Sequence, residues 1–114
     1  EIFSKSDIVT VHTPLTSKTK NFINKNSFNI MKKTAFIINT ARGGIVNQSD
    51  LKYALIKKKI AGAAIDVYEQ EPPKDMKLLK LPNLMCMPHI GGNSTEAVSA
   101  MGLAAINNLI KVIK

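Results

Sequence analysis

The chain has 114 residues, of which 45% are hydrophobic and 21% are charged. With a mean hydropathy of +0.01, this balance excludes a disordered chain and fits one globular domain, while the length excludes two. The formal net charge of +8 invites a nucleic-acid partner, but the lysines are scattered apart from residues 57–59, and only two Tyr and four Phe could stack on bases. We therefore interpret the lysines as a solvated surface and expect no nucleic-acid partner.

The apolar runs are short, and none approaches the roughly 18 residues that a membrane span needs. Residues 1–12, EIFSKSDIVTVH, have neither the basic start and apolar core nor the cleavage site of a signal peptide. We expect a cytoplasmic protein without a membrane partner. The single cysteine, Cys86, can form no disulfide within the chain and is expected to be buried, because Met85 and Met87 beside it are apolar.

Taken in chain order, residues 1–7 have the composition of the end of a helix, and four apolar runs follow at 8–11, 35–38, 63–67 and 84–87. These runs have the length of strands and are rich in strand-favouring residues. None alternates cleanly with polar residues, which is the pattern of strands buried on both faces of a parallel sheet.

Helical signals separate the strands. A short helix is predicted to begin at Asn26 or Ser27 and to end near Met31. Asn47, with Asp50 three residues later, is the pattern of a capped helix that continues through residues 51–59. The side chains expected on the buried face of that helix are Leu51, Ala54 and Leu55.

A long helix follows the last strand, where Asn93 and Glu96 resemble a capping box. Apolar residues then recur at steps of three and four, and we expect them to pack in the core: Val98, Met101, Ala105, Leu109 and Val112. Strands alternating with helices predict an α/β fold with a parallel sheet. The carboxyl ends of such strands share one edge of the sheet, where ligands of open α/β sheets bind.

Each predicted strand ends in polar or glycine-rich residues. The second is followed by Asn39-Thr40-Ala41-Arg42-Gly43-Gly44, which contains the only arginine beside fifteen lysines. Arginine presents a rigid fork that matches a carboxylate through two hydrogen bonds, which a lysine does not. Arg42 is therefore a candidate for binding a substrate carboxylate, and the alternative is that it pairs with a carboxylate of the chain to fix its loop.

His89 follows the fourth strand and is the natural candidate for proton transfer. A carboxylate beside it would orient the imidazole, and the end of the third strand offers three: Asp66, Glu69 and Glu71. His12, after the first strand, is interpreted as structural or as flanking a cofactor. Two histidines and one cysteine in separate segments show no metal-ligand spacing, so no metal is expected.

Four stretches resemble a known family: SDIVTVHTPLTSKTKNFIN, MKKTAFIINTARGGIVNQSDLKYAL, IAGAAIDVYEQEPP and LPNLMCMPHIGGNSTEAV. They follow one another as in the D-isomer-specific 2-hydroxyacid dehydrogenases, and the resemblance covers nearly the whole chain. Within the family, HIGGNSTEAVSAMG is most similar to D-3-phosphoglycerate dehydrogenases, which belong to serine biosynthesis. The resemblance implies a Rossmann-like dinucleotide-binding domain, NAD as cofactor, a small 2-hydroxy or 2-keto acid as substrate, and a homodimer of the full-length protein.

The resemblance also implies roles for matching residues. Arg42 would bind the carboxylate and carbonyl of the substrate, His89 would be the acid and base, and Glu71, rather than Glu69, would support His89. In reduction His89 would donate a proton to the forming alkoxide, and in oxidation it would remove the hydroxyl proton. The positions implied around the nicotinamide half of the cofactor are Thr13, Thr40, Ala41, Arg42, Asp66, His89, Gly91 and Gly92.

The chain contains no G-x-G-x-x-G and no acidic ribose-binding residue about twenty positions after it. We therefore expect residues 1–114 to be the second half of a dinucleotide-binding domain, without the first half and without a separate substrate domain. Two alternatives stay open: a non-catalytic, dinucleotide-sensing protein of the corepressor type with the same fold, and a small basic nucleic-acid module.

Overall fold

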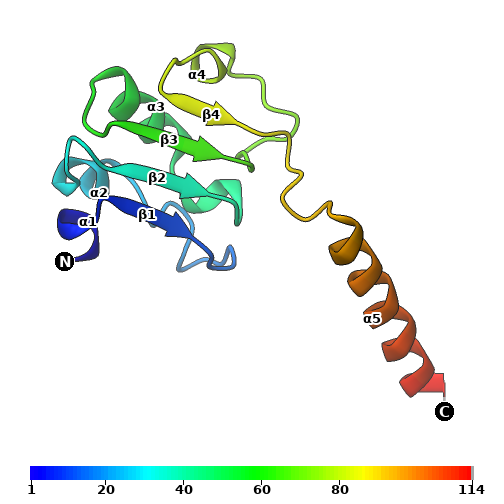
Figure 1. Ribbon diagram of the computed structural model, residues 1–114. Helices are drawn as coiled ribbons and strands as arrows, with labels where there is room; N and C mark the ends of the chain where they lie inside the picture. Colours follow the sequence, from blue (N-terminus) through cyan, green and yellow to red (C-terminus); the bar gives the residue numbers. More distant parts are fainter. Residues whose placement is uncertain (114) are drawn as a thin grey trace.

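Four parallel strands form one sheet in the computed structural model, which describes residues 1–113 (Figure 1). The strands are β1 (Ile8–Val11), β2 (Phe36–Asn39), β3 (Gly62–Ile65) and β4 (Leu84–Cys86), and they lie side by side in chain order. This confirms the predicted parallel α/β sheet, with the second and third strands each displaced by one residue from the predicted start. The helices are α1 (Ile2–Lys5), α2 (Lys25–Ile30), α3 (Gln48–Ile56), α4 (Met76–Leu79) and α5 (Thr95–Ile113), with a 3₁₀ turn, η1, at Gly43–Ile45.

The N-terminus of each of four helices is capped by a polar side chain near its first residue. Asn47 caps α3 by accepting the N–H of Asp50 at 2.9 Å, as the sequence predicts. Helix α2 is capped by Asn24, two residues before the earlier of the two predicted starts. In α5 the side chain of Ser94, and not that of Asn93, accepts the N–H of Ala97 at 3.2 Å. Helix α4, which the sequence analysis did not predict, begins after Asp75, whose carboxylate accepts two backbone N–H groups.

The core lies on one face of the sheet. The pairing register puts Val9, Ile37, Ala63 and Leu84 in one buried row across all four strands. Helices α2 and α3 lie against this face and against each other. Their largest fully buried side chains are Phe28, Leu51 and Leu55. Burial here holds the strand ends, and so the loops after them, in fixed relative positions.

The opposite face of the sheet is uncovered within residues 1–113, which corrects the expectation of strands buried on both faces. Ile8, Phe36 and Met85 on that face are 60%, 48% and 64% exposed. Because parallel crossovers are right-handed, strands that follow one another in a single direction place their connecting helices on the same side. The unbroken order β1-β2-β3-β4 therefore leaves the second face to other segments or chains.

Helix α5 corrects a second expectation, because it extends away from the sheet and none of its residues is buried (Figure 1). Val98, Met101 and Leu109 of the predicted core stripe are 54–60% exposed. Residues 87–94 lead the chain off the sheet edge, so no other described element reaches the helix. By length and composition α5 is also long and apolar enough to cross a membrane, although core helices of soluble proteins meet the same criteria.

Candidate active site

Arg42 stands on a turn at the carboxyl end of β2 that is held by a buried asparagine. The side chain of Asn39 donates to the carbonyl of Arg42 at 3.0 Å and accepts the N–H of Ala41 at 3.1 Å. Asn39 is only 2% exposed, so the turn is tied to the sheet from inside. The guanidinium of Arg42 is exposed and donates to the carbonyl of Ala41 at 2.7 Å. No carboxylate in residues 1–113 pairs with it, which removes the alternative of a loop-fixing ion pair.

His89 has a left-handed backbone, with φ of +57°, in a turn that Asp66 holds from the end of β3. One carboxylate oxygen of Asp66 accepts the N–H of Ile90 at 2.9 Å and the other accepts the N–H of Gly91 at 2.7 Å. A Cβ at Gly91 would lie 2.8 Å from Asp66 Oδ2, so a larger residue there would displace the carboxylate from this contact. The left-handed conformation is unfavourable for a residue with a side chain, and the two hydrogen bonds offset its cost.

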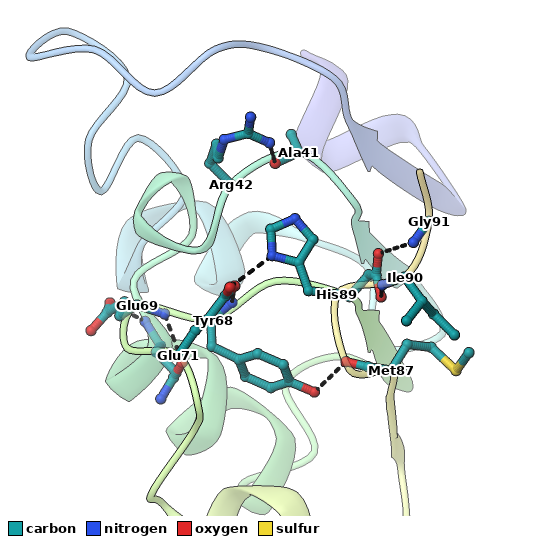
Figure 2. A network of polar contacts seen from close by, with 11 residues as sticks. Ala41, Arg42, Tyr68, Glu69, Glu71, Met87, His89, Ile90 and Gly91 are labelled. Carbon is teal, nitrogen blue, oxygen red and sulfur yellow. Dashed lines mark hydrogen bonds and ion pairs between the residues drawn. The ribbon is translucent and has the colours of Figure 1, made fainter. Parts of the chain in front are cut away.

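The imidazole of His89 pairs with Glu71. Glu71 Oε2 lies 2.7 Å from His89 Nδ1, and Glu71 Oε1 accepts the backbone N–H of Tyr68 at 3.0 Å (Figure 2). Of the three carboxylates that the sequence offered, Glu71 is the one in contact with the imidazole. Glu69 instead accepts the N–H of Gln48 at 2.8 Å.

Tyr68 joins the loops that carry Arg42, Glu71 and His89. Its hydroxyl donates to the carbonyl of Met87 at 2.8 Å, two residues before His89. Gly43, directly after Arg42, packs against the Tyr68 backbone so closely that a Cβ at that position would fall 2.0 Å from the Tyr68 carbonyl. The glycine is thus required by a close approach of two loops, and it sets the separation of Arg42 and Glu71.

The electrostatics of the site favour two ionised carboxylates. The hydrogen bond from His89, followed by that from the Tyr68 N–H, lowers the pKa of Glu71 below its ordinary value. Burial alone would raise the pKa of Asp66, but the N–H groups of Ile90 and Gly91 and the charge of His89 outweigh it, so that pKa is also lowered. Burial, with Cys86 nearby, raises the pKa of Tyr68 to about 12, so its hydroxyl stays a hydrogen-bond donor.

Two adjoining cavities occupy the carboxyl edge of the sheet. The first, of about 620 Å³, is lined by Arg42, Glu71 and His89 among others. The second, of about 610 Å³, shares Leu15 and Arg42 with the first. Its other lining residues are His12, Thr13, Pro14, Thr40 and Ala41. Arg42 therefore stands between the two cavities.

The second cavity is lined by the small or hydroxyl-bearing Thr13, Thr40 and Ala41 and lies beside the cavity of His89. Gly92 has no atom within 4 Å of an added Cβ and is open to a ligand. Asp66 and Gly91 use their polar groups on each other. His12 accepts or donates one hydrogen bond with Thr10, Nε2 to Oγ1, at 2.8 Å. Residues 1–113 contain no cluster of His, Cys, Asp and Glu suited to a metal ion.

Three residues of the site were not assigned a role by the sequence analysis: Asn39, Tyr68 and Lys20. Asn39 could have been found from its place at the end of a buried strand, three residues before the only arginine. Tyr68 offered only its position between Asp66 and Glu71. Lys20, which lines the first cavity, had no distinguishing signal among fifteen lysines.

A parallel sheet thus carries a glycine-bearing arginine turn and a histidine–carboxylate pair at its carboxyl edge, which is the edge where open α/β sheets bind ligands. Residues 1–91 match the D-isomer specific 2-hydroxyacid dehydrogenase, NAD binding domain, and the chain belongs to this family. This confirms the family resemblance and NAD as the cofactor of the family.

Relatives of known function are consistent with this family assignment. The chain is 42% identical over 114 residues to D-3-phosphoglycerate dehydrogenase of Methanocaldococcus jannaschii, covering 100% of this chain and 22% of that protein. It is 47% identical over 114 residues to glyoxylate reductase of Thermofilum pendens, covering 99% of this chain and 34% of that protein. The chain thus spans about a third or less of these relatives.

Solved structures agree in fold. A glyoxylate reductase from Paecilomyes thermophila superposes with a TM-score of 0.94 at 34% identity, over 99% of this chain and 34% of that one. An NAD-complexed D-isomer specific 2-hydroxyacid dehydrogenase from Lactobacillus delbrueckii ssp. bulgaricus superposes with a TM-score of 0.86 at 28% identity. This match covers 98% of this chain and 38% of that one.

Proposed function

We propose that this chain is the catalytic half of the NAD-binding domain of a dehydrogenase that interconverts D-2-hydroxy acids and 2-keto acids. The observation that carries the proposal is the 2.7 Å contact between Glu71 and His89 on the wall of the cavity that Arg42 also lines. The complete enzyme supplies the pyrophosphate cradle and a substrate domain from outside residues 1–114, which accounts for the missing G-x-G-x-x-G.

In the proposed reaction, Arg42 binds the substrate carboxylate through its two parallel N–H groups. Because Glu71 holds Nδ1 of His89, Nε2 is the nitrogen left to exchange a proton with the oxygen on carbon 2 of the substrate. Ionised Glu71 stabilises the protonated imidazole and fixes its orientation. NAD, when bound in the second cavity beside Thr13, Thr40 and Ala41, supplies or accepts the hydride.

The substrates, assembly and location of the complete protein are further parts of the proposal. Its substrate is a small 2-hydroxy or 2-keto acid, with 3-phosphoglycerate the first candidate because a D-3-phosphoglycerate dehydrogenase is among the relatives. It is proposed to act in serine biosynthesis, in the cytoplasm, as a homodimer. The uncovered apolar sheet face and the exposed helix α5 are the surfaces available for packing with the rest of the polypeptide or a second copy.

The test uses the complete polypeptide that contains this chain, with Arg42→Lys and His89→Gln as variants. Loss of the fork or of the proton carrier is expected to lower kcat/KM for a 2-keto acid by about 10²- to 10⁴-fold. Lys57→Gln is the control, because Lys57 is exposed at the end of α3 and lines neither cavity, and it is expected to retain most activity. A non-catalytic, dinucleotide-sensing protein would instead bind NADH equally well in all four forms and turn over no substrate in any of them.

A further inference from the structure

We propose that Lys20 is a specificity residue of this active site, and that the preferred substrates carry a second anionic group, a phosphate or a carboxylate, in addition to the first carboxylate. This inference rests on the proposed dehydrogenase function and names the class of acid that the site selects. Among residues 1–113, Lys20 is the one lysine that lines the first cavity, which it shares with Arg42 and His89.

Lys20 reaches the cavity because its segment is paired with the segment that follows Arg42. The N–H of Asn21 donates to the carbonyl of Gly44 at 2.8 Å, and the N–H of Ile23 donates to the carbonyl of Ile45 at 3.1 Å. Ile23 and Val46 form an isolated parallel bridge. The backbone on which Lys20 stands is therefore fixed beside the Arg42 turn.

The loop before Lys20 is also ordered by its own contacts. The hydroxyl of Thr19 donates to the carbonyl of Pro14 at 2.7 Å, and the N–H of Thr16 donates to that hydroxyl at 2.7 Å. Asn21 has a left-handed backbone, with φ of +53°, which turns the chain directly after Lys20. A lysine on a pre-ordered turn loses less conformational freedom on binding a ligand than one on a mobile loop.

The charges on the cavity wall leave two permanent cations without a partner. Glu71 is engaged by His89 and the Tyr68 N–H, and Glu69 accepts the N–H of Gln48. Among residues 1–113, neither Lys20 nor Arg42 forms an ion pair with a carboxylate. A substrate with one carboxylate would neutralise only Arg42.

The two cations also differ in the anion that each fits. The planar fork of Arg42 matches the flat carboxylate of a 2-hydroxy acid, whereas the compact ammonium of Lys20 acts as a point charge on a flexible stem. A phosphate or carboxylate at the far end of the substrate suits such a group, because its position varies with substrate length. Lys20 would therefore discriminate between acids that share the same reacting carbon.

The experiment compares 3-phosphoglycerate with D-glycerate as substrates of the complete polypeptide, because the two differ only in the distal phosphate. The wild type is expected to show a kcat/KM at least about tenfold higher for 3-phosphoglycerate, since a hydrogen bond to a charged group is of that order. Lys20→Met should lower kcat/KM for 3-phosphoglycerate by about 10- to 100-fold, mainly through KM, and change that for D-glycerate by less than about threefold. Lys18→Met, in the same loop but not on the cavity wall, should change neither.

Three results would overturn the inference. A wild type that oxidises D-glycerate at least as well as 3-phosphoglycerate leaves the dehydrogenase function standing and removes the specificity. An equal loss for both substrates in Lys20→Met, or no loss for either, shows that Lys20 does not read the distal group. Absence of turnover with every 2-hydroxy acid removes the proposed function and this inference together.

Discussion

Asp66 offers the sharpest test of how the fold holds the His89 turn, through the variant Asp66→Asn. The carboxylate accepts two backbone N–H groups, at 2.9 Å and 2.7 Å, and hydrogen bonds to a charged group contribute about 1.5–3 kcal/mol each. An asparagine keeps one neutral acceptor, worth about 1 kcal/mol, and turns its own NH₂ toward the other N–H. Because Asp66 is buried, we expect the turn to lose about 2–5 kcal/mol of local stability.

The assay is hydrogen exchange of the peptide 87–92, followed by mass spectrometry in the complete polypeptide. The amides of Ile90 and Gly91 should exchange at least about 30-fold faster in Asp66→Asn at pH 7, since about 1.4 kcal/mol corresponds to a factor of ten. Asp7→Asn is the matched control, because Asp7 is exposed and, among residues 1–113, its ion pair is with Lys32 on the surface. Equal exchange of these two amides in the wild type and in Asp66→Asn would refute the account of the turn.

The effect of Asp66→Asn on amide exchange should also depend on pH. The folded-state pKa of Asp66 is lowered, so its stabilisation is fully present above the ordinary value of about 3.9 and is lost as pH falls through the folded value. The difference in exchange between the wild type and Asp66→Asn should therefore narrow below about pH 4. A difference that stays constant or widens there would show that the charge of Asp66 is not what holds the turn.

Three other predictions concern the site and the isolated chain. Gly43→Ala should lower kcat/KM by about 10²-fold, because its Cβ would displace the Tyr68 backbone and misplacements of about 1 Å have costs of that order. The control Gly102→Ala, with open space around Gly102, should leave kcat/KM unchanged. A fully active Gly43→Ala enzyme would contradict the packing argument. Glu71→Gln should reduce kcat by about 10-fold or more, because a neutral amide stabilises the protonated imidazole less, and an unchanged kcat would count against the Glu71–His89 contact in catalysis. Residues 1–114 alone should bind NADH weakly in calorimetry and self-associate in size-exclusion chromatography, because an apolar sheet face is exposed; tight stoichiometric binding or a monomeric peak at high concentration would oppose this.

The sequence predicted the sheet well because strand identity is a local property. The four apolar runs, the parallel direction of the strands and the Asn47 cap all follow from residues close together in the chain. What covers each face is not local, and here the prediction was wrong for the outer sheet face and for helix α5. An apolar stripe such as Val98, Met101 and Leu109 indicates that a face is to be buried, but it does not say against which segment.

The candidate site, like the fold, was predicted in part from the sequence. Parallel topology alone placed Arg42 and His89 at one edge, and the resemblance selected Glu71 from three carboxylates. The support of the Arg42 turn by Asn39 is local, because Asn39 contacts Ala41 and Arg42 within three residues. The role of Asp66 as a clamp on the His89 turn depends on contacts across strands, which no spacing reveals. The same holds for Lys20, whose place on the cavity wall depends on the pairing of residues 20–23 with residues 43–47.

If this sheet edge carries out NAD-dependent chemistry on D-2-hydroxy acids, NADH formation should depend on the enantiomer supplied. The complete polypeptide is mixed with NAD and the D- or L-form of a 2-hydroxy acid, and absorbance of NADH is followed. We expect NADH formation with the D-form and none above background with the L-form. NADH formation with neither enantiomer of any acid tested, or with the L-form alone, would contradict it.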